Sequence, residues 1–365
     1  MNLIQSFSPS DAAGTVAGPK LETRRDDNGM LRAAAQLTRD LNVPDARIYW
    51  ADMLGSAFLG YAALALAVAA GGGAVTLLAG LVAILALFRA GSFIHELTHI
   101  KQGALPGFKR AWNMLVGIPL LVPSFLYEGV HNLHHAKIRY GTVEDPEYLP
   151  LALMKPWTLP LFVVAAALAP IALLFRFAVL APLSLASPRL RRLVVERYSG
   201  LQINPHFRRK PAEGPLARQW RFQECATSLW SITLVALVVS GTVSVAAFLI
   251  FLGIASGVML LNQTRTLVAH LWENEGEAMS VTEQYLDSVN VPPPSPFAAL
   301  WAPVGLRYHA LHHLLPGLPY HALGQAHRRL LESLGPESAY HGANYGGLSP
   351  LVRRLAVSSW RGAKR

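Results

Sequence analysis

Three short histidine clusters are the part of this sequence best suited to chemistry. Spacings of three and four residues place the members of each cluster on one face of a helix. Packing many imidazoles together without a metal would cost desolvation and cause repulsion on protonation, so we expect them to bind metal. The clusters are HELTH (His95, His99), HNLHH (His131, His134, His135) and HALHH (His309, His312, His313).

HELTH alone also fits the zinc protease pattern, in which two histidines bind zinc and Glu96 activates water. Zinc normally takes four ligands, so one zinc would leave at least half of the clustered histidines unused, whereas two metals would use them. A membrane zinc protease would also need a downstream aspartate in a membrane helix, and the main apolar runs after residue 110 contain none. The membrane zinc protease is therefore the remote alternative. A metal transporter would place its ligands inside the crossing helices.

The composition indicates a membrane protein. Of 365 residues, 52% are hydrophobic and 15% are charged, against roughly 25% charged residues in soluble domains. The single cysteine, Cys225, excludes an internal disulfide, an iron-sulfur cluster and a cysteine zinc site. The net charge of +10 comes mostly from arginines in loops between apolar runs. That distribution favours a membrane topology signal over nucleic-acid binding.

Two apolar hairpins are predicted to cross the bilayer. Residues 49–70 and 74–88 are joined by GGG, and SGTVS interrupts the run 225–262, giving four transmembrane helices. The runs 114–126 and 157–175 contain prolines, and crossing by 157–175 would move the arginine-rich loop 186–222 outside. We therefore predict that both are re-entrant or interfacial.

The predicted fold is an all-α integral membrane protein with a cytosolic histidine-rich cap and both termini in the cytosol, most simply in a bacterial inner membrane. The N-terminal sequence lacks the basic start and apolar run of a cleaved signal. We divide the chain into a flexible N-terminal tail (1–38), a membrane domain (39–332) and a basic C-terminal tail (333–365).

The three clusters around two hairpins resemble the membrane-bound fatty acid desaturase family. The stretch HHLLPGLPYHALGQAHRRL is similar to the family's sequence after its third histidine box, and HHAKIRYGTVEDPEY is similar to its second box with the following Asp-Pro. RDLNVPDARIYWADMLGS also resembles bacterial members. The resemblance covers residues 39–332.

The resemblance implies a centre of two iron ions, bound by the eight clustered histidines and by His270, which follows the last predicted transmembrane helix. It also implies molecular oxygen as co-substrate and a lipid acyl chain as substrate. Nearby carboxylates can orient ligand rings, and the candidates are Glu96, Glu128, Asp145 and Glu147. His321 stands where related sequences more often have an aromatic residue, and we expect it to support the ligand rings or to lie beside the substrate rather than to bind metal. We expect His206, His327 and His341 to be surface or structural residues.

The family resemblance favours desaturation, the removal of two hydrogens from an unactivated acyl chain. The alternative on the same scaffold is a hydroxylase or ketolase of a lipid or hydrocarbon. The chain has neither a haem-binding pattern nor the thiolates of an electron carrier, so we expect a separate carrier of the ferredoxin, rubredoxin or cytochrome b5 type.

Overall fold

The computed structural model describes residues 26–295 and 297–362, and these residues form helices and loops without a strand. The four longest helices are α2 (Ala46–Ala70), α3 (Gly73–His99), α10 (Gly214–Val239) and α11 (Val245–Leu267). The shorter elements are α1 (Asn28–Leu37), η1 (Arg39–Leu41), α4 (Phe108–Trp112), η2 (Asn113–Gly117), η3 (Ser124–Leu126), α5 (Val130–His134), α6 (Thr158–Val164), η4 (Ala165–Leu168), α7 (Ala169–Phe175), η5 (Arg176–Leu180), α8 (Ala181–Ser184), α9 (Pro188–Tyr198), α12 (Val281–Asp287), α13 (Ala298–Trp301), α14 (His309–Leu314), η6 (Tyr320–Ala322), α15 (Leu323–Ser333), η7 (Ala339–Ala343) and α16 (Leu348–Gly362).

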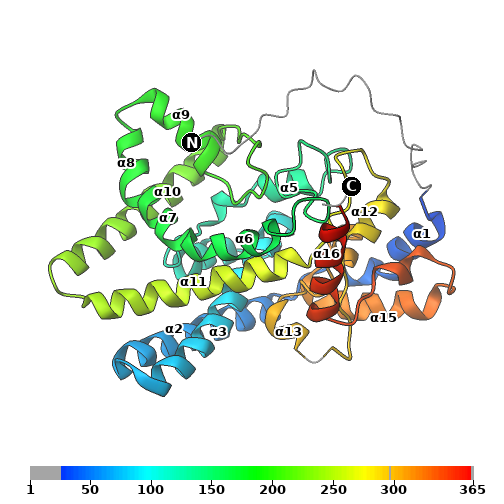
Figure 1. Ribbon diagram of the computed structural model, residues 1–365, viewed down its shortest axis with the longest axis horizontal. Helices are drawn as coiled ribbons and strands as arrows, with labels where there is room; N and C mark the ends of the chain where they lie inside the picture. The colour runs from blue at the N-terminus through cyan, green and yellow to red at the C-terminus, as the bar shows by residue number, and fades with distance from the viewer. Residues whose placement is uncertain (1–25, 296, 363–365) are drawn as a thin grey trace.

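Both expected helical hairpins are present. The α2–α3 turn is made by Gly71, Gly72 and Gly73, all at positive φ, a backbone region that glycine enters without steric cost. Small residues then let the two helices approach closely, because a Cβ on Gly60 would lie 2.6 Å from the Leu87 side chain. The two hairpins project to one side of the molecule, and α12, α15 and α16 lie at the other side (Figure 1).

Five helical segments of the described chain are long and apolar enough to cross a membrane, one more than the four crossings predicted, and this marks an integral membrane protein. The additional segment is Thr158–Ser184, 27 residues formed by α6 to α8. Pro160 does not interrupt it, and Pro170 stands at the start of α7. The segment packs along α11, and the assignment of 157–175 as re-entrant or interfacial stays a prediction.

The run 114–126 forms only the short elements η2 and η3, which are too short to span, and η2 packs against α3. Residues 1–25 of the expected N-terminal tail, and 363–365 at the other end, lie outside the described residues. The rest of both tails folds onto the domain. Helix α1 packs against α15 through Met30 and Ala34, and α16 buries Leu351 and Leu355. Each segment carries an apolar stripe at helical spacing, which favours this packing.

Candidate metal centre

All nine predicted histidines converge in two adjacent groups. Within each group one nitrogen of every ring lies within 4.8 Å of the corresponding nitrogens of the others. The groups adjoin, because the ring centroids of His135 and His313, one from each, are 4.2 Å apart. The five-histidine group contains His95, His99, His131, His135 and His312, and the four-histidine group contains His134, His270, His309 and His313.

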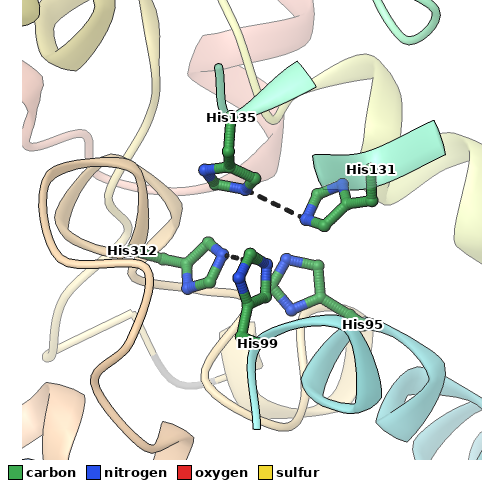
Figure 2. A group of neighbouring side chains, drawn as sticks. All are labelled: His95, His99, His131, His135 and His312. Carbon is green, nitrogen blue, oxygen red and sulfur yellow. Dashed lines mark hydrogen bonds between the residues drawn. The ribbon is translucent and has the colours of Figure 1, made fainter. Parts of the chain in front are cut away.

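Helix geometry explains how each HxxHH cluster serves both groups. His131 of α5 and His135, the residue directly after that helix, are four residues apart and face the five-histidine group, whereas His134 points to the other group. In α14 the division is reversed, since His309 and His313 share the four-histidine group. Figure 2 shows the five rings turned toward one another from α3, from α5 and the residue after it, and from α14. The clusters therefore link the two groups rather than forming separate sites.

Ring nitrogens face one another within each group, and burial favours the neutral form of most of these rings. Facing Nε2 atoms approach within 3.0 Å in His131–His135 and His270–His309, and within 3.2 Å in His99–His312. Neither ring nitrogen of buried His95 has a hydrogen-bond partner among the described residues. Burial lowers the pKa of His131, His270 and of the other clustered rings outside the membrane segments, except His134. Neutral imidazoles offer a lone pair to a metal.

Two of the expected carboxylates hold ligand rings. His134 Nδ1 donates to both oxygens of fully buried Asp145, at 2.9 and 3.0 Å. Burial lowers the pKa of His134, but the Asp145 charge and hydrogen bonds outweigh that effect and raise it. His131 Nδ1 lies 3.0 Å from Glu147 Oε1, and the Tyr127 hydroxyl donates to the other Glu147 oxygen. Burial raises the pKa of Glu147 to about 7.

Sequence reasoning missed the partner of His270. The Tyr140 hydroxyl lies 2.8 Å from His270 Nδ1 and donates to Asp287 at 2.7 Å, so it accepts from the ring and links it to a carboxylate. Burial raises the pKa of Asp287 to about 6. Tyr140 follows the second cluster closely, which is a usable signal. The sequence gives no comparable signal for Asp287, because α12 reaches this position only in the folded chain.

Arg265 is a second contact that the sequence did not suggest. This buried arginine of α11 places Nη2 2.9 Å from His309 Nδ1. A guanidinium can only donate, so this contact favours the His309 tautomer that carries its proton on Nε2, the nitrogen that faces His270 and His313. Binding of a metal there would require that proton to leave. His309 thus differs from His134 and His270, whose Nδ1 atoms face acceptors.

The other two carboxylate candidates contact different residues. Glu96 accepts from the Tyr49 hydroxyl and from the Tyr320 N–H at 3.2 Å, and it lies 3.8 Å from His95 Nδ1, beyond hydrogen-bond distance. Its hydrogen bonds go to these two tyrosines, which disfavours the protease interpretation, in which Glu96 activates a water. Glu128 binds Lys109 at 2.8 Å and Ser124 at 2.5 Å, so its expected role beside a ligand ring was wrong.

The remaining histidines lie outside both groups, as expected. His321 Nε2 accepts from the Asp45 N–H at 3.0 Å. His327 Nδ1 pairs with the Tyr340 hydroxyl at 2.8 Å, and His341 Nε2 with the Gly335 carbonyl at 3.0 Å. His206 is exposed.

Comparison with known proteins agrees with this geometry. The sequence pattern of the fatty acid desaturase family matches residues 73–345, which include all nine histidines. A protein named ceramide hydroxylase from Caulobacter vibrioides (strain NA1000 / CB15N) is 51% identical over 322 residues, covering 88% of this chain and 92% of that protein. The chain is an oxidoreductase and belongs to the fatty acid desaturase family.

Proposed function

We propose that this protein is an oxygen-dependent hydroxylase of ceramide or a closely similar N-acyl lipid. The observation that carries the proposal is the 51% identity to a ceramide hydroxylase over almost the whole of both chains. The sequence alone favoured desaturation, and the relative reverses that preference. Desaturation remains the second candidate, because the family match and the sequence after the third cluster are compatible with it.

We assign two iron ions to the two histidine groups, with all nine histidines as ligands. When bound, the irons supply the oxygen activation that removal of hydrogen from an unactivated methylene requires. The protein's own part is to keep the imidazoles neutral by burial and to fix their orientation. Asp145 holds His134, Glu147 holds His131, and Tyr140 holds His270.

The surroundings of the centre suit a lipid substrate. Three of the nine histidines, His95, His99 and His270, lie at the end of α3 and just after α11, two helices long and apolar enough to span a bilayer. An acyl chain can reach such a site from the membrane without passing through water. We place the histidines and both termini in the cytosol of a bacterial cell, where a ferredoxin, rubredoxin or cytochrome b5 type carrier would supply electrons.

The test is lipid analysis of a host that contains ceramide and expresses this chain with a plant-type ferredoxin and its reductase. A hydroxylase adds one oxygen atom to ceramide, and growth under isotopically labelled oxygen places the label in the product. Loss of two hydrogens without added oxygen would instead establish the desaturase. The His134→Ala variant is the matched control, and iron analysis of the purified protein should give two ions per chain.

A further inference from the structure

An ion pair joins α2 to α3, close to the histidines. Both Arg89 Nε and Nη2 donate to Asp52, each at 2.6 Å, and the Tyr320 hydroxyl donates to the same carboxylate at 2.7 Å. Arg89 stands six residues before His95 on α3, and a helix rises ~1.5 Å per residue, so the pair is about 9 Å along the axis from that ring.

The pair is not the only contact between the two helices among the described residues. Close packing around Gly60 and Leu87 already joins α2 to α3. Charges within a spanning segment are costly, and they commonly mark a functional site. The Arg89 side chain is also 38% exposed, and its Nη1 makes no hydrogen bond to another described residue, so a donor remains for a ligand.

Open space adjoins the pair on the lipid side. Gly55 lies one turn from Asp52 on the same face of α2, and a Cβ placed there would meet no atom within 4 Å. The same helix faces continue deeper into the apolar part with Leu59 on α2 and Val82 on α3, which are 52% and 41% exposed. This apolar stripe leads away from the histidines, so it would hold the chain of a two-chain lipid that is not attacked, with the polar head at the ion pair between that chain and the centre.

We propose that the notch formed by Asp52, Gly55, Arg89 and Tyr320 binds the uncharged polar head of the lipid substrate. Arg89 offers a donor and Asp52 an acceptor, which fits a head with hydroxyl and amide groups. The pair is neutral as a whole, and the Asp52 carboxylate would repel a phosphate. The assignment rests on the proposed function, because it names the substrate group recognised beside that centre.

Tyr320 connects the notch to the histidines. Its hydroxyl binds Asp52, while its backbone N–H binds Glu96, the neighbour of His95. Tyr320 is also the first residue of η6, which follows α14, and α14 carries three of the nine histidines. A head bound in the notch would therefore be held by the same segments that position the ligand rings, which fixes the distance between the head and the attacked carbon.

The test measures equilibrium binding of tritiated N-palmitoyl sphinganine to the full-length protein in nanodiscs, with its di-O-methylated analogue and phosphatidylglycerol as competitors. We expect the wild type to prefer the free ceramide over the methylated analogue by about tenfold, since one or two hydrogen bonds to the head are lost. The double variant Asp52→Asn/Arg89→Gln should reduce that preference below about threefold. In turnover, the same variant should raise KM for ceramide and largely spare kcat.

Gly55→Leu is a second variant, which leaves the ion pair intact and fills the open space beside it. It should also reduce the preference for free ceramide, and it replaces the double variant in the test if that protein does not fold. Gly253→Leu on lipid-facing α11, where a Cβ also meets no atom within 4 Å, is the matched control and should bind like the wild type. The assignment is overturned if folded variants keep the wild-type preference, or if phosphatidylglycerol competes as well as ceramide. Wild-type protein that keeps the preference but forms no oxygenated ceramide would refute the proposed function and support the notch.

Discussion

The two histidine groups differ in how the rest of the protein holds them. In the four-histidine group, three rings contact a neighbouring side chain that is not a histidine: Asp145, Tyr140 or Arg265. In the five-histidine group, His131 alone among the described residues has such partners at its Nδ1, which lies within hydrogen-bond distance of Glu147 and of the Tyr127 hydroxyl. The group with fewer rings is thus the more strongly oriented, which indicates that orientation compensates for a smaller number of donors.

The largest expected effect comes from removing a ring of the four-histidine group. His134→Ala leaves three histidines there, whereas His135→Ala leaves four in the other group. We expect His134→Ala to abolish lipid oxidation and to lower iron from two ions per chain to one, while His135→Ala retains more iron. Iron content by elemental analysis, together with product formation, checks this. Equal iron loss in both variants would remove the difference between the groups.

The supporting carboxylates should give the next largest effect. Asp145→Asn replaces an acceptor that binds His134 through both oxygens, and we expect a 10–100-fold loss of iron affinity, measured by competition with a chelator. Glu147→Gln should cost less, because Tyr127 also contacts His131 Nδ1, at 2.8 Å. A larger effect at Glu147 than at Asp145 would show that the five-histidine group depends more on its single support.

Tyr140→Phe should have an intermediate effect, since it removes the link between His270 and Asp287 and retains the ring. We expect about tenfold weaker iron binding at the four-histidine group, at the lower end of the range for such supporting residues. Tyr148→Phe is a matched control, because that hydroxyl reaches Asp287 at 3.2 Å without touching His270. If both variants behave alike, Asp287 rather than the Tyr140 link is what the centre requires.

The difference between the groups could be predicted from the sequence only in part. The spacings within the three clusters are local, so they correctly indicated rings on common helix faces. Which ring joins which group depends on how α3, α5 and α14 meet, and a spacing does not carry that information. Asp145 is near its ring in sequence, whereas Asp287 and Arg265 reach theirs only through the folded chain.

The membrane part shows the same limit. Glycine turns and apolar length predicted both hairpins, because these features act locally. The prolines at 160 and 170 suggested a break, yet Thr158–Ser184 is one continuous helical run. A proline leaves a backbone carbonyl of its helix without an N–H partner, and packing against α11 helps this segment to tolerate that loss. The ends of the chain fold onto the domain for a related reason, since their short apolar stripes find partners that become adjacent only in the fold.

The smallest expected effect lies beside the five-histidine group, at Glu96. Its carboxylate contacts Tyr49 and Tyr320 rather than a ligand ring, so Glu96→Gln keeps an oxygen that can accept from both. We expect activity within about threefold of the wild type and two iron ions per chain, in contrast to Asp145→Asn. A protease of the HExxH type would instead lose its water-activating base. Loss of activity by more than about 100-fold with iron retained would therefore mean that Glu96 acts directly in the chemistry, and that the five-histidine group has a functional carboxylate of its own.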